Sequence, residues 1–211
     1  MEYSHVIWDW NGTLINDVTW SIRCVNIMLN KRGLPTLDSV EAYHRVFGFP
    51  IIDYYSRIGF DYEKEPFEIL AVEFVDLYLD TERGYALFPD VEEMLKDYKN
   101  RGIGQIILSA CEMGLLLSQS KVFGIDSYFD EILGISDIYA ASKMDLAMSY
   151  MERAHPKNAI LIGDSDHDKE VADALGIDCI LIARGHQSKE TLLSCGAVVL
   201  DSIKELKHTL G

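Results

Sequence analysis

Acidic residues follow two short apolar runs in this chain of 211 residues. The run Val6-Ile7-Trp8 ends at Asp9, and the run 159–162 is followed by Asp164 and Asp168. A carboxylate can attack phosphorus to form an acyl phosphate, and carboxylate oxygens also suit Mg²⁺. The two groups predict metal-assisted phosphoryl transfer, in which Asp9 is the nucleophile. A cation held by Asp164 and Asp168 would reduce the repulsion between Asp9 and an anionic substrate.

Three further residues have uses in the same chemistry. Ser109 ends the apolar run 106–108 and would donate a hydrogen bond to a phosphoryl oxygen. Lys143 opens a predicted helix and would supply a fixed positive charge near the transferring group. Gly12 allows a tight turn, so loop N–H groups can face phosphate oxygens.

Alternating strands and helices are the elements that must position these residues. After the first strand, the predicted strands are 106–109, 131–133, 159–162, 179–182 and 197–200. Continuous apolar strands that alternate with helices indicate a doubly wound α/β domain, with a parallel sheet covered on both faces. Ligands of such sheets bind beyond the carboxyl ends of the strands, where Asp9, Ser109 and Asp164 fall.

Local signals predict where several core helices begin. Asp90 to Glu93 resembles a capping box and predicts a helix that ends at Gly102. Ser142 is the predicted N-cap of the helix that contains Lys143. A later helix is predicted over 169–175.

Residues 16–87 show a different pattern. Apolar residues recur at helical spacing from Val18 to Leu29, and further helices are predicted over 39–46, 51–58 and 66–79, with no convincing strand. We interpret 16–87 as an all-helical cap inserted into an α/β core made of 1–15 and 88–211.

The composition and the net charge argue against several classes of binding partner. Hydrophobic residues make up 48% of the chain and charged residues 25%, as in ordinary globular proteins. The net charge of −15 argues against nucleic-acid partners and against an anionic membrane surface. It permits a phosphorylated small molecule where a cation offsets the local charge. The chain has no apolar run of about 18 residues, no signal-peptide pattern and no metal-ligand spacing among its four cysteines, so we expect a cytoplasmic protein. Its oligomeric state, monomer or homodimer, stays open at this point.

The motifs together resemble those of a known family. The segment Asp9 to Leu14, DWNGTL, resembles the first motif of the haloacid dehalogenase superfamily, usually DxDGT in its phosphatases. Ser109, Lys143 and the segment GDSDHD at 163–168 match the second, third and fourth motifs in order. The resemblance covers nearly the whole chain, since the helical block falls where that family carries its cap. It is strongest to the phosphoglycolate-phosphatase-like branch.

The resemblance implies roles for individual residues. Asp9 would accept the phosphoryl group and bind Mg²⁺, together with the backbone carbonyl of Asn11 and with Asp164. Asp168 would bind the metal directly or through water. Ser109 and Lys143 would hold the phosphoryl group. The remaining predicted substrate contacts are Gly12, Thr13 and Ala110.

One departure from the family pattern concerns proton transfer. Asn11 stands at a catalytic position where the family's phosphatases have an Asp that resembles a general acid and base. An amide donates hydrogen bonds but cannot transfer a proton at these pH values. General acid–base help is typically worth about 10²–10⁴-fold in rate. Asn11 therefore predicts slow turnover, a good leaving group, or a proton carrier from elsewhere. The candidate carriers are His44, Asp166 and His167.

The resulting prediction is a Mg²⁺-dependent phosphatase of a small phosphorylated metabolite. One alternative is another enzyme of the superfamily, acting on a phosphonate, a phosphosugar or a halide. Phosphonate cleavage resembles a pathway that requires a cap lysine, for which Lys31 and Lys64 are available. The other alternative is a non-catalytic regulator that binds a phosphorylated ligand.

Overall fold

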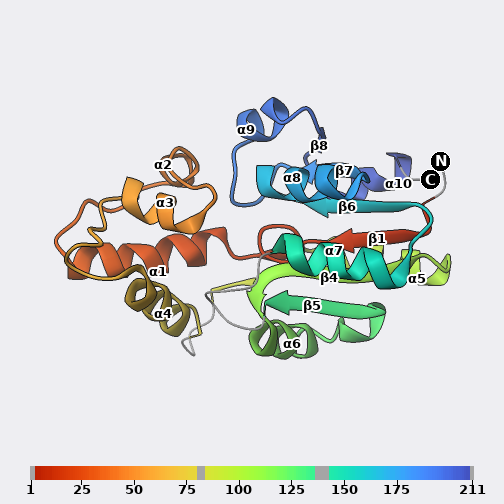
Figure 1. The fold of residues 1–211 in the computed structure, drawn as a ribbon, viewed down its shortest axis with the longest axis horizontal. Coiled ribbons are helices and arrows are strands. Elements are labelled where there is room, and N and C mark those ends of the chain that lie inside the picture. Colours follow the sequence, from red (N-terminus) through yellow and green to blue (C-terminus); the bar gives the residue numbers. More distant parts are fainter. Residues whose placement is uncertain (1–2, 80–83, 136–142, 210–211) are drawn as a thin grey trace.

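A six-stranded parallel sheet forms the centre of the protein (Figure 1). The computed structural model describes residues 3–79, 84–135 and 143–209. The strand order is β5-β4-β1-β6-β7-β8, with β1 pairing in parallel with both β4 and β6. The strands are β1 His5–Trp8, β4 Gly104–Glu112, β5 Glu131–Ile135, β6 Ala159–Gly163, β7 Asp178–Ile182 and β8 Val198–Leu200. The predicted α/β class with a parallel sheet is confirmed.

Helices cover both faces of this sheet, which explains why its strands are continuously apolar. Val6 and Trp8 of β1 pack on the face covered by α5 and α6, and Ile7 packs on the face covered by α7 and α8. The core helices are α5 Val91–Asn100, α6 Met113–Val122, α7 Lys143–Ala154, α8 Asp166–Leu175, α9 Lys189–Ser194 and α10 Leu206–Thr209, with 3₁₀ turns at Asp126–Tyr128 and Ile203–Glu205.

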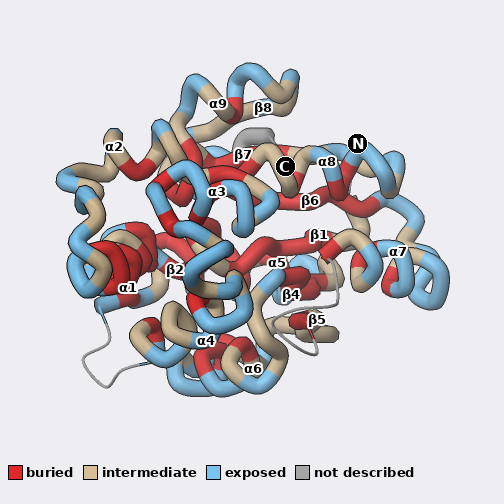
Figure 2. Tube along the Cα trace, turned by 60° about the vertical axis from the view of Figure 1, so that its left-hand side comes forward, coloured by how far each residue is buried: buried red, intermediate tan, exposed pale blue. Residues whose placement is uncertain are grey.

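Four helices gather beyond one end of the sheet (Figure 1) and have a hydrophobic core of their own. They are α1 Val18–Lys31, α2 Val40–His44, α3 Ile51–Arg57 and α4 Phe67–Tyr78. Figure 2 shows the buried side of α1 turned toward the other cap helices. Met28, Tyr43 and Leu70 are almost fully buried in this second core. The helical character predicted for this block is therefore present, while its boundaries at 16 and 87 stay a prediction.

Two short strands at the base of the cap were not predicted. β2 Ile15–Asn16 and β3 Ala86–Leu87 pair in antiparallel orientation where the chain enters and leaves the cap. The expectation of no strand in 16–87 is wrong at these positions, because two-residue strands are too short to show a period.

Two other local predictions need correction. The Asp90 side chain does not cap α5 but accepts hydrogen bonds from Arg184 and Ser202, at 2.8 Å each. Helix α8 begins at Asp166 rather than 169, because Ser165 and Asp168 form a capping box. The N-cap predicted at Ser142 lies outside the described residues. No helix within the described ranges combines the length and apolarity needed to cross a membrane.

Candidate functional site

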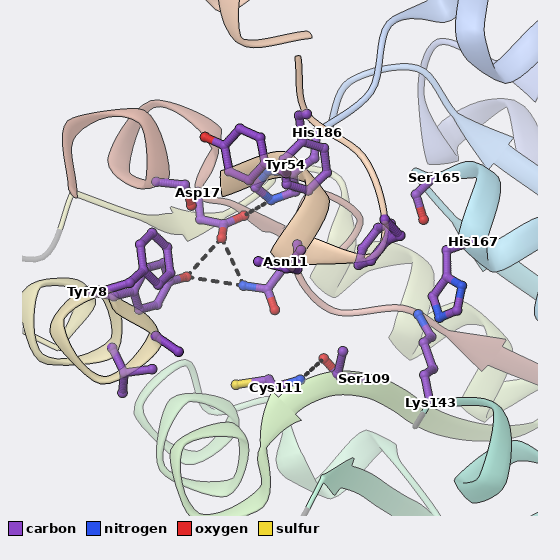
Figure 3. Close-up of a pocket in the computed structure, with 18 of the residues that line it drawn as sticks. Asn11, Asp17, Tyr54, Tyr78, Ser109, Cys111, Lys143, Ser165, His167 and His186 are labelled. Carbon is purple, nitrogen blue, oxygen red and sulfur yellow. Dashed lines mark hydrogen bonds and ion pairs between the residues drawn. The ribbon is translucent and has the colours of Figure 1, made fainter. Parts of the chain in front are cut away.

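A cavity of about 310 Å³ lies between the carboxyl ends of the strands and the cap helices (Figure 3). The sheet side contributes most of the predicted site, namely Asp9, Asn11, Ser109, Ala110, Lys143 and Asp164. The cap side is largely aromatic and includes Tyr43, Phe49, Tyr54, Phe67, Phe74 and Tyr78. The topology therefore brings the predicted polar residues to one place, as the rule for strand ends requires.

A buried cluster of one cation and three carboxylates forms the polar end of this cavity. We call Asp9, Lys143, Asp164 and Asp168 the phosphoryl cluster. The Lys143 Nζ contacts Asp9 and lies 2.5 Å from Asp168 Oδ1. Asp9, Asp164 and Asp168 each offer one oxygen, and these atoms lie within 4.8 Å of one another. Three hard oxygen donors at this spacing fit a divalent cation such as Mg²⁺.

Asp168 is held rigidly by the start of α8. Its Oδ2 accepts hydrogen bonds from the Asp164 N–H at 3.1 Å, the Ser165 N–H at 3.0 Å and the Ser165 hydroxyl at 2.6 Å. The other oxygen, Oδ1, accepts from Lys143. Asp168 therefore positions both Lys143 and the turn that carries Asp164.

Charges within the phosphoryl cluster shift one another's pKa values. Burial raises the pKa of Asp9 to about 6, against the opposing charge of Lys143. Burial and the nearby carboxylates of Asp9 and Asp168 raise the pKa of Asp164 well above its usual range. Burial alone would lower the pKa of Lys143, but Asp168 and Asp9 raise it, so this lysine stays charged. A divalent cation among the carboxylates would relieve their mutual repulsion.

The tight turn at Gly12 packs closely against Asp164. Gly12 has a φ of 72°, and a Cβ there would lie 2.2 Å from Asp164 Oδ2. Its N–H donates to Asp17 Oδ1 at 2.9 Å and to the Ile15 carbonyl at 3.0 Å. The Thr13 side chain is fully buried. Neither Gly12 nor Thr13 lines the cavity, so their predicted substrate contacts find no support in this geometry.

Ser109 and Ala110 lie where the sequence predicts. Both line the cavity from the carboxyl-terminal part of β4, which continues to Glu112, and Ser109 is 1% exposed. The Ser109 Oγ accepts a hydrogen bond from the Cys111 N–H at 3.0 Å, which fixes its rotamer and leaves its proton to donate.

A second buried polar cluster was not predicted from the sequence. Asp17 Oδ2 accepts hydrogen bonds from Asn11 Nδ2 at 2.8 Å and from the Tyr78 hydroxyl at 2.9 Å (Figure 3). Asp17 Oδ1 lies 3.2 Å from His186 Nε2, and His186 Nδ1 lies 2.8 Å from the Tyr43 hydroxyl. We call these five residues the Asp17 cluster. Because a carboxylate only accepts hydrogen bonds, the Asn11 amide must turn its NH₂ group toward Asp17.

Asp17 and His186 form an ion pair at neutral pH. Burial opposes both charges, but His186 lowers the pKa of Asp17, and Asp17 raises the pKa of His186 to about 9. Asp17 occupies the N-cap position of α1 without capping it. The sequence signal at Asp17 was therefore indistinguishable from that of an ordinary helix start.

The three predicted proton carriers have different surroundings. The His44 Nε2 lies 3.0 Å from the Gly185 carbonyl, and His44 does not line the cavity. Asp166 accepts from Gln187 at 2.7 Å. His167 does line the cavity, with its ring stacked on Phe49 at a centroid distance of 4.8 Å.

Comparison with known proteins supports the resemblance. Residues 6–182 match the family of haloacid dehalogenase-like hydrolases. The tyrosine-protein kinase PtkA of Mycobacterium tuberculosis is 26% identical over 98% of this chain and 72% of its own length. The phosphoglycolate phosphatase of Pseudomonas putida is 24% identical over 95% of this chain and 77% of its own.

Solved structures share the fold over the whole chain. The haloacid dehalogenase-like family protein SP0104 of Streptococcus pneumoniae has a TM-score of 0.82 at 20% identity, covering 99% of each chain. The structure of M. tuberculosis PtkA has a TM-score of 0.82 at 23% identity, covering 100% of this chain and 99% of that one. The family match, the order of the motifs and the convergence of their residues agree, and the chain belongs to the haloacid dehalogenase-like hydrolases.

Proposed function

We propose that this protein is a Mg²⁺-dependent phosphatase that hydrolyses a small phosphorylated metabolite through a phospho-aspartate on Asp9. The observation that carries the proposal is the phosphoryl cluster, in which Lys143 and three carboxylates meet at one end of the cavity. The phosphatase relative from P. putida supports the same reaction class.

The residues present can divide the reaction into two displacements. Asp9 attacks phosphorus, and the bond from phosphorus to the leaving oxygen breaks. Water then attacks the phosphoryl group and releases inorganic phosphate, which restores Asp9. Lys143 and Ser109 would hold phosphoryl oxygens as charge builds on them. Mg²⁺ bound by Asp9, Asp164, Asp168 and the Asn11 carbonyl would supply positive charge that offsets the repulsion between Asp9 and the substrate.

Asn11 limits the first displacement, because its amide cannot transfer a proton to the leaving oxygen. Its NH₂ group is also occupied by Asp17 and by the Tyr78 hydroxyl, at 2.8 and 3.2 Å. The leaving oxygen must therefore depart with little acid help, or take its proton from water.

Release of p-nitrophenolate from p-nitrophenyl phosphate tests the proposal, since this leaving group needs little acid help. We expect Mg²⁺-dependent turnover that EDTA abolishes and that Asp9→Asn lowers at least 10³-fold. Asp130→Asn changes an aspartate outside the cavity and is the matched control. Unchanged release by Asp9→Asn, or full activity in EDTA, would refute the proposal.

The alternatives have weaker support. The two cap lysines that a phosphonate pathway would need are exposed and paired, Lys31 with Glu73 at 2.9 Å and Lys64 with Asp61 at 2.7 Å, and neither lines the cavity. A halide substrate needs no metal and would leave the three clustered carboxylates without a use. A non-catalytic phospho-ligand binder predicts no p-nitrophenolate at all.

The named relatives leave the organic part of the substrate open. PtkA is named for tyrosine, a phenol, whereas the phosphoglycolate phosphatases are named for an aliphatic ester that carries a carboxylate. A cytoplasmic setting and a monomeric or homodimeric state remain part of the proposal.

A further inference from the structure

The wall of the cavity opposite the phosphoryl cluster is apolar and aromatic. One stripe of α4 faces the cavity, at positions 67, 71, 74, 75 and 78. This spacing follows the helical repeat, so a single face of α4 forms the wall. Phe49, Ile51 and Tyr54 line the cavity from α3 and the segment before it. The substrate's organic group would therefore meet carbon over most of its surface.

Few residues that line the cavity can carry a positive charge. Among the described lining residues, the groups that can be cationic are Lys143, His167 and His186. Lys143 is engaged by Asp9 and Asp168, and His186 by Asp17. His167 stacks on Phe49 and has Glu170 Oε2 3.2 Å from its Nδ1. A substrate with a second anionic group, such as a carboxylate, would lose hydration here without gaining a dedicated partner.

Apart from the apolar wall, Asn11 also restricts which leaving groups can depart. A phenolic oxygen has a pKa near 10, as in tyrosine, and departs as an anion far more readily than an alkoxide. A cavity without an acid at position 11 therefore favours aryl esters over alkyl esters. Size agrees with this, because about 150 Å³ is enough to hold a benzene ring and this cavity measures about 310 Å³.

From the aromatic wall and the blocked Asn11 amide, we infer that the substrate is an aryl phosphate monoester whose ring carries no second anionic group. The inference rests on the proposed phosphatase function and names its substrate class. The ring packs against Phe49, Phe67 and Phe74, and the phosphoryl group meets Asp9. Attack by Asp9 breaks the bond between phosphorus and the phenolic oxygen, which leaves as phenolate and takes a proton from water.

Three esters test the leaving-group argument and the apolar-wall argument separately. For each ester, kcat/KM is measured with the full chain and Mg²⁺. Phenyl and benzyl phosphate share a ring but differ in leaving group, and we expect phenyl phosphate to be favoured at least 100-fold. Benzyl phosphate and 2-phosphoglycolate are both alkyl esters, and we expect the benzyl ester to be favoured at least 10-fold.

The outcomes distinguish this inference from the function on which it rests. If 2-phosphoglycolate is hydrolysed as well as phenyl phosphate or better, the aryl assignment is wrong and the phosphatase proposal stands. If no ester, including p-nitrophenyl phosphate, releases phosphate, both fail.

A charge placed in the stripe tests the wall directly. Ala71→Arg puts a cation into the cavity-facing row of α4, and we expect the ratio of benzyl phosphate to 2-phosphoglycolate turnover to fall at least 30-fold. Val72→Arg adds the same charge one residue on, at a side chain that is 41% exposed and outside the cavity, and should leave the ratio within twofold. An unchanged ratio in a folded Ala71→Arg protein would overturn the inference.

If Ala71→Arg does not fold, competitive inhibition of the unmutated protein tests the same wall. Phenylphosphonate should compete with p-nitrophenyl phosphate at least 10-fold more tightly than phosphonoacetate does. Tighter binding of phosphonoacetate would contradict an apolar site for the organic group.

Discussion

The phosphoryl cluster and the Asp17 cluster are both buried, and both pair carboxylates with a cation, yet they are assembled differently. The phosphoryl cluster comes from the ends of β1 and β6 and the first residues of α7 and α8. The Asp17 cluster joins the segment between β1 and β2, the residue after β2, two cap helices and the loop after β7. The first is therefore a product of the core's topology, whereas the second requires the cap to lie on the core.

Removing the cation from the phosphoryl cluster should have the largest effect. Lys143→Met leaves Asp9 and Asp168 buried without their shared partner, which we expect to cost about 3–5 kcal/mol of stability. The lost charge at the phosphoryl group should lower kcat about 10²–10³-fold. Lys96→Met on α5, where the side chain is exposed, is the control.

Urea unfolding and p-nitrophenyl phosphate turnover measure these two effects. A Lys143→Met protein with near-normal kcat would show that this lysine neutralises Asp9 and Asp168 without acting on the substrate.

Changing the cation of the Asp17 cluster should affect stability in a pH-dependent way. The pKa of His186 is raised from 6.5 to about 9 in the folded chain. The imidazolium therefore stabilises the fold fully below pH 6.5, and this contribution is lost as the pH rises through about 9. We expect His186→Gln to lose about 3 kcal/mol at pH 6 and much less at pH 10.

Urea titrations of parent and variant between pH 6 and 10 measure this difference. His155→Asn, at an exposed histidine, should show no such trend. A stability gap that is constant or widens with rising pH would contradict an ion pair between His186 and Asp17.

A carboxylate introduced at position 11 should have the smallest effect on the rate. It tests whether Asp17 constrains this position. Asn11→Asp places a second carboxylate where Asn11 Nδ2 now lies 2.8 Å from Asp17 Oδ2. Their repulsion raises the pKa of one of them and should cost about 1–3 kcal/mol. We therefore expect less than a 10-fold gain with benzyl phosphate, well below the about 10²–10⁴ that a free acid supplies.

The double variant Asn11→Asp with Asp17→Asn relieves this repulsion and should raise benzyl phosphate turnover at least 10-fold above the single variant. A 100-fold gain from Asn11→Asp alone, without loss of stability, would show that Asp17 does not constrain position 11.

The positions of several site residues could be predicted from the apolar pattern of the strands together with the topology of a parallel sheet. Asp9 and Asp164 were found because each ends an apolar strand, and parallel strands bring their carboxyl ends to one edge. The first cap helix was predicted from its periodicity, and α4 from an apolar segment that begins at Pro66. These features depend on residues close together in the chain, or on a general rule of sheet topology.

The remaining features depend on pairings between distant residues that no local pattern encodes. Asp17 meets His186 from 169 residues away, and Asp90 meets Arg184 from 94 residues away. Asp90 was predicted to cap a helix, but its side chain binds Arg184 and Ser202 instead. Asp17 also lies at a helix start without capping it, and no prediction was made for it. Folding places these carboxylates beside a buried cation, which outweighs the gain from a cap.

The pairing of β2 with β3 has a consequence for how the sequence of the cap can change. Because the two strands pair directly, the cap begins and ends at neighbouring points on the core. A segment with adjacent ends can be lengthened, shortened or exchanged with little added entropy cost to the rest of the chain. Changes within the helical insert can therefore alter the cap side of the cavity, while the residues of the phosphoryl cluster stay the same.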